Sequence, residues 1–381
     1  MQISKQLSNI KPSYIREILA ATQTPGMLSL AGGLPASELL PVEDLIASMQ
    51  SLSLSPEVFQ YGETLGYKPL LHFLKDKYEL PSENEAMICT GSQQAIDLIA
   101  RGFLNPGDTV AMEAPSYLGA LQVFGLAQAN ICTIEQRKDG PDLEQLEAEF
   151  AKGKIKLFYG VPDFHNPTGV CWSLEVRKAV ARLCSQYGVA FIEDVPYREL
   201  RFTGSEQPLV SSFCQDNAFV LRSFSKISSP GLRLGMVSAP KEWVSSLVKI
   251  KQASDLHTGL PMQAVLLTLL QSPNFNKHLD NIRSNYKQRY HVLYDSLAPL
   301  IGEHCDCNQV EGGMFVWLKL RNANAMELTQ TLLKKNVAVV PGDVFYSCEN
   351  LAKPALRLNF THSTLEQLET AVARIGEVLR A

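Results

Sequence analysis

Lys226 lies in a run whose residue types could bind a carbonyl compound that carries a phosphate. Ser223 and Ser225 place hydroxyls beside it, and Arg233 follows in the same glycine-containing stretch. A lysine amine attacks a carbonyl only where its pKa is lowered or where the partner is bound beside it. Hydroxyls and a guanidinium are donors suited to phosphate. The combination indicates pyridoxal 5'-phosphate (PLP), although this run alone is equally typical of a Ser/Gly-rich turn with a solvated lysine.

A carboxylate follows an apolar run upstream of this lysine. Residues 189–193 predict a buried strand that ends at Asp194. Ligands of open α/β sheets bind at the carboxyl ends of strands, and a PLP enzyme needs a carboxylate at the pyridinium nitrogen. Asp194 is placed for that role, and the phenol of Tyr197 could donate to the ring oxygen. Taken alone, an aspartate in this position is more often a cap or turn residue.

Two earlier segments also place polar residues after predicted strands. One strand, at residues 157–162, leads into Asn166-Pro167-Thr168-Gly169, where the Asn166 amide could hold the phenolic oxygen of the cofactor. The other leads into Gly91-Ser92-Gln93, which opens a helical pattern whose free backbone N–H groups would suit a phosphate. The plain alternatives are an ordinary turn at Asn166 and an ordinary serine N-cap at Ser92.

Three further residues could take part in binding or catalysis, but the neighbouring sequence supports these roles less strongly. Tyr117 could stack on a flat heteroaromatic ring, or it could be a partly buried core tyrosine. His165 directly precedes Asn166, where a proton relay or a substrate contact is possible, but a structural hydrogen-bond donor is the commoner role. Arg16 could pair with the distal carboxylate of a substrate, although a surface arginine is again the commoner case.

These segments occur in the order typical of one protein family. The chain resembles the class I/II aminotransferases of fold type I. The segments at residues 29–35 (Ser-Leu-Ala-Gly-Gly-Leu-Pro) and 60–62 (Gln-Tyr-Gly) are similar to the subgroup that contains 2-aminoadipate and kynurenine aminotransferases. The resemblance covers nearly the whole chain, and although each motif is short, seven motifs in the family's order are specific.

The resemblance implies a role for each residue around the cofactor. Lys226 would form the Schiff base with PLP and would move the proton between the substrate Cα and the cofactor. Asp194 would contact the pyridinium nitrogen, Asn166 and Tyr197 would donate to the ring oxygen, and Tyr117 would stack on the ring. The residues expected to bind the phosphate are Ser92, Gln93, Ser223, Ser225 and Arg233.

The resemblance also implies substrate contacts and a homodimer. Arg357 would clamp the substrate α-carboxylate with its bidentate fork, and the leucines on either side of it suggest that it points to the opposite face of a strand. Asn166 would face the same substrate, and Gly33 would lie near it. Tyr61 would reach the PLP phosphate in the neighbouring subunit of a homodimer.

The implied function is ping-pong transamination. An amino group would move from an L-amino acid (aromatic, branched-chain or aminoadipate-like) to a 2-oxo acid such as 2-oxoglutarate. Another PLP reaction in the same fold, such as β-elimination, decarboxylation or racemisation, is the main alternative, because a fold does not fix a function. A third hypothesis is an effector-binding regulator, but the sequence offers no DNA-binding domain beside the aminotransferase-like part.

Composition narrows the class of protein. A net charge of −4 and a pI near 6.0 argue against general binding to nucleic acid. The longest mainly apolar run, at residues 264–270, is too short to cross a bilayer, and the N-terminus has no signal-peptide pattern. The eight cysteines are scattered without metal-ligand spacing, so we expect no metal and a reducing, cytoplasmic location.

Periodicity predicts an α/β fold, with a large domain built on a mostly parallel sheet and a smaller α+β domain. We expect a helix at residues 12–21 and another at 42–52. Short strands are predicted at 109–112, 130–134, 156–161, 189–193 and 219–223, with helices at 93–103, 143–152 and 174–187 among them. Two further strands are predicted in the C-terminal part, at 312–318 and 337–340. The expected division is an N-terminal segment at 1–45 that packs with the small domain, a PLP-binding domain at 46–280 and a C-terminal domain at 281–381.

Overall fold

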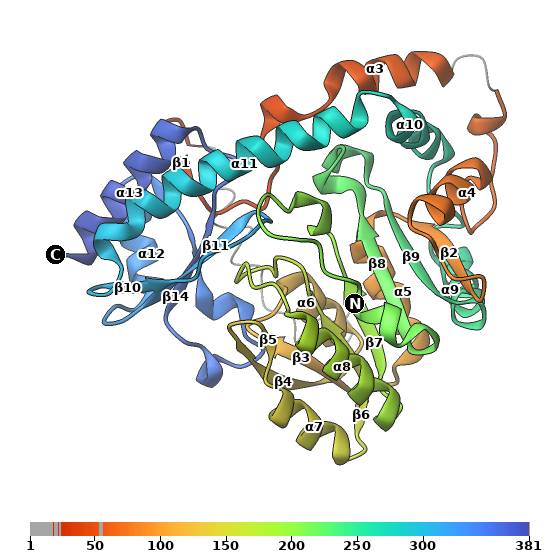
Figure 1. Ribbon diagram of the computed structural model, residues 1–381, viewed down its shortest axis with the longest axis horizontal. Coiled ribbons are helices and arrows are strands. Elements are labelled where there is room, and N and C mark those ends of the chain that lie inside the picture. The colour runs from red at the N-terminus through yellow and green to blue at the C-terminus, as the bar shows by residue number, and fades with distance from the viewer. Residues whose placement is uncertain (1–17, 19–21, 23, 53–55, 381) are drawn as a thin grey trace, which may run out of the picture.

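The computed structural model describes residue 18, residue 22 and residues 24–52 and 56–380. A mostly parallel sheet and an antiparallel sheet are joined by one long helix, α11 (Phe275–Leu297), which runs along the upper side of the molecule in Figure 1. The predicted helix at 12–21 falls almost entirely outside the described residues. Because α11 contains residue 281, the predicted domain boundary falls within a continuous helix, and the boundary stays a prediction.

The larger sheet is mostly parallel, as predicted. Its strands follow the order β2-β9-β8-β7-β6-β3-β4-β5, with parallel pairing from β8 through β7, β6 and β3 to β4. Strand β9 is antiparallel to both of its neighbours, so β2 points the same way as β8. The bounds are β2 (Asn84–Cys89), β3 (Thr109–Ala114), β4 (Asn130–Arg137), β5 (Gly140–Pro141), β6 (Ile155–Gly160), β7 (Ala190–Asp194), β8 (Ala218–Ser223) and β9 (Gly235–Pro240).

Alternating side chains bury the two faces of this sheet under different helices. Tyr159 and Ile192 face the core that contains α5, whereas their neighbours Phe158 and Phe191 face the core that contains α7 and α8. The helices of this half are α3 (Val42–Ser51), α4 (Lys68–Lys77), α5 (Gly91–Phe103), α6 (Leu118–Leu126), α7 (Leu143–Ala151), α8 (Leu174–Tyr187), α9 (Lys241–Ser254) and α10 (Leu260–Gln271).

The smaller sheet is antiparallel, in the order β10-β11-β14-β13, and it packs with helices near the C-terminus (Figure 1). A separate parallel pair joins β1 to β12, so the chain near residue 28 lies beside the C-terminal elements. The bounds are β1 (Leu28–Ser29), β10 (Cys305–Cys307), β11 (Phe315–Leu320), β12 (Val337–Ala338), β13 (Val340–Pro341), β14 (Ala355–Asn359), α12 (Ala325–Lys334) and α13 (Leu365–Leu379).

Two predicted strands differ from the structure. The run at 337–340 is divided between β12 and β13, which pair with different partners. The strand predicted from Gly312 begins only at Phe315, because Gly313 has a φ of 78°, a left-handed conformation that interrupts an extended strand. Short 3-10 helices complete the described fold: η1 (Ser37–Leu39), η3 (Pro56–Phe59), η4 (Arg198–Leu200), η5 (Val210–Phe213), η6 (Gln215–Asn217), η7 (Phe224–Lys226), η8 (Pro230–Leu232), η9 (Ala298–Leu300), η10 (Gly342–Phe345) and η11 (Glu349–Leu351).

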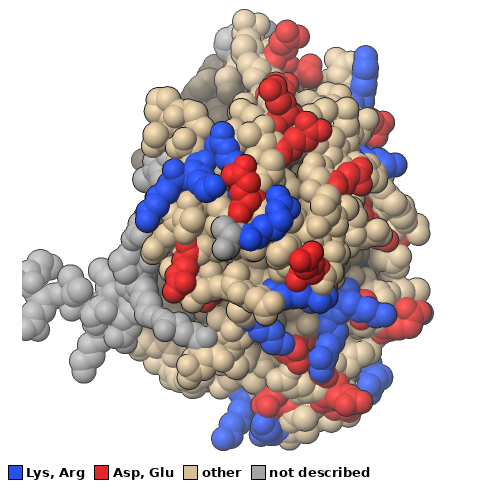
Figure 2. All heavy atoms as spheres, turned by 90° about the vertical axis from the view of Figure 1, so that its left-hand side faces the viewer, with Lys and Arg blue, Asp and Glu red and all other residues tan. Residues whose placement is uncertain are grey.

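The surface charges are mixed on the face that Figure 2 presents. Basic and acidic side chains alternate there, and the described part of this face carries no broad region of one sign. Among the described residues, no helix is long and apolar enough to cross a membrane, and no group of three or more His, Cys, Asp or Glu side chains could hold a metal ion.

Candidate active site

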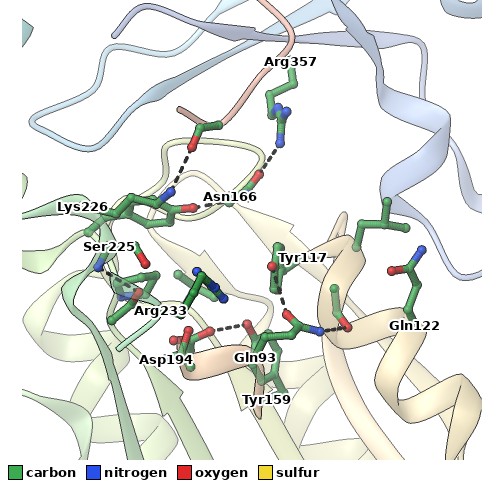
Figure 3. A pocket seen from close by; sticks show the side chains of 18 residues that line it. Gln93, Tyr117, Gln122, Tyr159, Asn166, Asp194, Ser225, Lys226, Arg233 and Arg357 are labelled. Carbon is green, nitrogen blue, oxygen red and sulfur yellow. Dashed lines mark hydrogen bonds between the residues drawn. The ribbon is translucent and has the colours of Figure 1, made fainter. Parts of the chain in front are cut away.

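One pocket of about 500 Å³ collects the residues that the sequence singles out. It lies at the edge of the larger sheet where the carboxyl ends of β2, β3, β6, β7 and β8 meet, with Arg357 reaching in from the smaller sheet (Figure 3). Every residue for which the family resemblance implies a role lines it, except Tyr61. The set comprises Gly33, Ser92, Gln93, Tyr117, Asn166, Asp194, Tyr197, Ser223, Ser225, Lys226, Arg233 and Arg357.

Lys226 reaches the pocket from the short helix η7, which follows β8. Ser223 caps this helix by accepting a hydrogen bond from the backbone N–H of Ser225, which fixes the turn before the lysine. The Lys226 Nζ donates to the backbone carbonyl of Gly33 at 2.9 Å. Burial, helped by the positive charges of Arg233 and Arg357, lowers the pKa of Lys226 to about 8. The amine is therefore partly neutral near physiological pH.

Asp194 ends β7 and is buried beside Tyr159 of the neighbouring strand β6. The Tyr159 hydroxyl donates to Asp194 Oδ2 at 2.8 Å, whereas Oδ1 is buried without a hydrogen-bond partner. Burial raises the pKa of Asp194 to about 7, and the hydrogen bond from Tyr159 opposes that shift. A buried carboxylate oxygen with nothing to bind would be stabilised by a cationic N–H donor.

Asn166 connects the turn after β6 to Arg357 of β14. Its Oδ1 accepts from Arg357 Nη1 at 3.0 Å, and its Nδ2 donates to the Tyr197 hydroxyl at 3.4 Å. Arg357 also donates to the carbonyl of Ala31, and its guanidinium lies 4.4 Å from the centre of the Phe315 ring. Burial lowers the pKa of Arg357 to about 10, so the guanidinium stays charged in a dry site.

The N-terminus of α5 and Arg233 form the polar end of the pocket. Gly91 begins the helix with a φ of 75°, and a Cβ at this position would lie 2.8 Å from Arg233 Nη2. Only glycine therefore allows the guanidinium to lie against the start of the helix. Arg233 itself has a left-handed φ of 55°. The helix terminus and the arginine together favour an anion.

A hydrogen bond joins the side chains of Tyr117 and Gln93 at the wall of the pocket. The Tyr117 hydroxyl donates to Gln93 Oε1 at 3.1 Å, and Gln93 Nε2 donates to the carbonyl of Gly119 at 2.9 Å. Burial raises the pKa of Tyr117 to about 12, so its phenol is neutral. The Gln93 side chain thus orients the ring of Tyr117, which Figure 3 shows at the pocket wall.

Tyr61 and His165 do not line this pocket. Tyr61 is 80% exposed, and its ring meets the edge of His257 at 6.0 Å. Arg16 lies outside the described residues. His165 is buried behind the pocket, where its Nδ1 lies 3.0 Å from Thr168 Oγ1. This contact agrees with the structural hydrogen-bonding role that the sequence favours for His165.

Sequence reasoning missed several residues of the pocket wall. Tyr159 is the most important, because it binds Asp194 directly. The available signal was a tyrosine near the carboxyl end of a predicted strand, but its meaning depends on β6 and β7 being neighbours. The other missed residues are Leu118, Gly119, Gln122, Val161 and Pro196.

The residues present fit PLP. The unpartnered Oδ1 of Asp194 matches a protonated ring nitrogen, and the glycine-opened helix with Arg233 matches a phosphate. Lys226 provides a partly neutral amine for the aldehyde. The pocket can therefore bind an anionic, carbonyl-bearing pyridine and, through Arg357, a carboxylate.

Comparison with known proteins agrees with this geometry. Residues 26–375 match the family model for aminotransferase class I and II. A 2-aminoadipate transaminase of Thermus thermophilus is 36% identical over 99% of this chain and 96% of its own length. Aromatic-amino-acid aminotransferase 1 of Thermococcus litoralis is 33% identical over 99% of this chain and 94% of its own.

A solved structure shows the same arrangement of the chain. The α-aminoadipate aminotransferase of Thermus thermophilus, crystallised with N-(5'-phosphopyridoxyl)-L-leucine, superposes with a TM-score of 0.91 at 34% identity. The match covers 99% of this chain and 97% of that one. Its ligand joins the pyridoxyl phosphate group to an amino acid, the two partners for which this pocket has donors.

Proposed function

Because the chain belongs to the class I and II aminotransferases and is a PLP-dependent aminotransferase, we propose that the pocket around Lys226 is its active site. The observation that carries the proposal is the convergence of three groups on one cavity: the Lys226 amine, the unpartnered Oδ1 of Asp194 and the Arg357 fork. When bound, PLP supplies a carbonyl group and a ring that accepts electrons. Neither the fold nor the relatives favour elimination, decarboxylation or racemisation.

Lys226 is the proposed covalent anchor of the cofactor and the base that moves the Cα proton. Its lowered pKa supports both roles, because a neutral amine is required for bonding to a carbonyl and for accepting a proton. The hydrogen bond from its Nζ to Gly33 places the amine beside another residue that lines the pocket. Asp194 is proposed to hold a proton on the pyridine nitrogen through its free Oδ1.

The remaining residues are assigned by their position in the pocket. Asn166 and Tyr197, which are hydrogen-bonded to each other, are proposed to donate to the ring oxygen. Tyr117 would stack on the ring, held by Gln93. For the phosphate we propose the start of α5 and the polar residues around Lys226: Ser92, Gln93, Ser223, Ser225 and Arg233.

Arg357 is proposed to bind the substrate α-carboxylate. Its Nε is buried without a partner, which leaves a donor of the fork for a carboxylate, and its guanidinium lies against the rings of Phe315 and Phe345. A carboxylate held there orients the substrate so that its Cα proton can face Lys226. Gly33 also lines the pocket and is proposed to lie near the substrate.

The proposed substrates are an L-amino acid donor and a 2-oxo acid acceptor such as 2-oxoglutarate. Relatives named for 2-aminoadipate and for aromatic amino acids support a donor with a long or aromatic side chain, and a branched-chain donor belongs to the same proposal. Both substrates would use Arg357 in turn, so ping-pong kinetics are expected. The cytoplasmic location drawn from cysteine usage stays a prediction.

We also propose a homodimer in which Tyr61 reaches the neighbouring site. Tyr61 and Phe59 are 80% and 66% exposed, and Leu256, next in sequence to the Tyr61 contact His257, is 43% exposed. Large apolar side chains exposed together are typical of an interface. Burial in a dimer would explain them.

The test is an absorbance spectrum of the purified PLP-bound protein, before and after addition of single amino acids without any oxo acid. A visible band that disappears with one amino acid, with release of one equivalent of its oxo acid, supports the proposal and identifies the donor. Release of carbon dioxide, of ammonia or of a racemised amino acid would show a different PLP reaction. A protein that forms no band with added PLP would contradict the assignment of Lys226.

A further inference from the structure

Glu113 and His165 form a buried pair directly behind the turn that carries Asn166. Both side chains are 1% exposed, and His165 Nε2 lies 3.8 Å from Glu113 Oε2. Glu113 comes from β3, whereas His165 comes from the turn after β6, so the pair joins two strands at the active-site edge of the sheet. Neither side chain lines the pocket, so direct contact with a substrate does not explain them.

One carboxylate oxygen of Glu113 lacks a hydrogen-bond partner. Glu113 Oε1 accepts from Gln136 Nε2 at 2.9 Å and from Trp172 Nε1 at 3.2 Å, whereas Oε2 is buried without a partner. His165 Nδ1 lies 3.0 Å from Thr168 Oγ1, and on its other side the Nε2 atom has Glu113 Oε2 as its polar neighbour. Glu113 Oε2, which has no hydrogen-bond partner, therefore faces His165 Nε2.

Burial determines the protonation states of Glu113 and His165. Burial raises the pKa of Glu113 to about 8, although the hydrogen bonds from Gln136 and Trp172 favour the charged form. Burial alone lowers the pKa of His165 to about 3. Charging both groups in so dry a place is costly, whereas a neutral acid can donate to a neutral imidazole.

We propose that Glu113 is a positioning residue of the active site, which as a neutral acid donates from Oε2 to His165 Nε2 and so fixes the turn that presents Asn166. In this arrangement a small side-chain rotation closes the 3.8 Å gap, and His165 Nδ1–H donates to Thr168 Oγ1. The backbone adds to the hold, because the His165 N–H donates to the Val170 carbonyl at 2.9 Å. The contacts run from Glu113 to His165 and from His165 to Thr168, and Asn166 lies between His165 and Thr168 in the chain.

The consequence concerns Asn166, the residue that contacts both Arg357 and Tyr197. A turn fixed from behind keeps the Asn166 amide in one orientation, as a preorganised site requires. The functional part of this inference rests on the proposed roles of Asn166 and Arg357. The protonation state of the pair does not depend on those roles and can be tested by itself.

The first measurement is the ¹⁵N chemical shifts of the His165 ring in the PLP-bound enzyme at about pH 7, assigned by comparison with a His165→Asn variant. A neutral ring protonated on Nδ1 is expected. A ring protonated on Nε2, or a charged imidazolium, would mean that Glu113 is the ionised partner and would overturn the proposal. This result stands whether or not the protein transaminates, so its failure is distinguishable from failure of the proposed function.

The second measurement compares two substitutions of Glu113. Glu113→Gln keeps a donor toward His165 and an acceptor toward Trp172, so kcat and KM for the amino donor should stay within about twofold of the parent. Glu113→Leu removes both, and kcat/KM should fall by at least about tenfold, mainly through a higher KM. Glu135→Gln, an exposed glutamate paired with Lys353, is the matched control for the Glu-to-Gln change.

A tenfold or larger loss in folded Glu113→Gln would contradict a neutral acid. Parent-like KM and kcat in folded Glu113→Leu would show that the pair has no positioning role. If Glu113→Leu does not fold, the ring shifts and the Glu113→Gln kinetics still decide between the two protonation states. Either measurement can therefore reject the proposal.

Discussion

The Tyr159 hydroxyl donates to Oδ2 of Asp194 at 2.8 Å and leaves Oδ1 of the same carboxylate buried without a partner. One oxygen is held by the protein and the other is left for a ligand. Because this hydrogen bond stabilises the charged carboxylate, it opposes the rise in the Asp194 pKa that burial causes. Two of the predictions below follow from this pair.

Tyr159→Phe should lower kcat by about 10- to 150-fold, the value of one hydrogen bond to a charged group. The substitution removes a contact that lowers the Asp194 pKa, so the pKa should rise. The proposed role of Asp194 requires its ionised form, and the acidic limb of the kcat–pH profile should therefore move to higher pH. Tyr294→Phe, distant from the pocket, serves as the control. An unchanged profile in Tyr159→Phe would separate the tyrosine from the titration of Asp194.

Asp194→Asn should stabilise the cofactor-free protein while weakening PLP binding and catalysis. The folded pKa of Asp194 is raised from 3.8 to about 7, so ionised Asp194 opposes folding above about pH 4 and increasingly up to about pH 7. The free energy of unfolding should rise by a few kcal/mol near pH 8, because a tenfold change in proton affinity corresponds to about 1.4 kcal/mol, and the gain should vanish near pH 4. Denaturant unfolding at both pH values measures it. An equal gain at both would refute the electrostatic cause.

Lys226→Ala should remove covalent attachment of PLP and lower turnover by about 10²- to 10⁴-fold, because the proposed anchor and base are lost together. PLP should still bind through the phosphate and ring contacts, so it should be released from the variant on denaturation even after borohydride treatment. Borohydride treatment followed by mass spectrometry distinguishes covalently attached PLP in the parent from releasable PLP in the variant. Lys241→Ala, at an exposed lysine that begins α9, is the control. Trapped cofactor in Lys226→Ala would place the anchor elsewhere.

Arg357→Lys should raise KM for the amino donor by about tenfold to a hundredfold with a smaller effect on PLP affinity. Lysine keeps the charge but loses the fork and the contacts to Asn166 and Ala31. Steady-state kinetics with donor and acceptor varied separately should show both KM values rising, since one residue serves both carboxylates. Arg321→Lys, at an exposed arginine paired with Asp306, is the matched control. An unchanged KM would assign the carboxylate to another group.

Tyr61→Phe should weaken PLP binding about tenfold or more without loss of folding, the effect of one hydrogen bond to a charged phosphate. The proposal requires a dimer, so sedimentation and PLP titration belong together. In mixed dimers of Tyr61→Phe and Lys226→Ala chains, the site that retains Lys226 has its Tyr61 supplied by the Lys226→Ala chain. Parent-like PLP affinity at that site is the expected result. A monomeric parent with tight PLP binding would contradict the role of Tyr61.

The sequence determined those features of the site that depend on short stretches of chain. Strands that end in Asp194 and Ser223, a helix that opens at Gly91 and the turn at Asn166 are local patterns, because strand and helix periods and glycine conformations are set by neighbouring residues. Parallel strands bring their carboxyl ends to one edge, so the sequence also predicted that these residues meet. The motif order then indicated the family.

The tertiary structure decided which groups touch. The hydrogen bonds from Lys226 to Gly33 and from Arg357 to Asn166 join residues far apart in the chain, and nothing local specifies them. Tyr159 can contact Asp194, and Glu113 can lie beside His165, only because β6 lies between β7 and β3. Strand order results from how the whole core packs, whereas a sequence pattern reports burial one segment at a time. The protonation of Asp194, Glu113 and Lys226 likewise depends on burial that only the assembled fold provides.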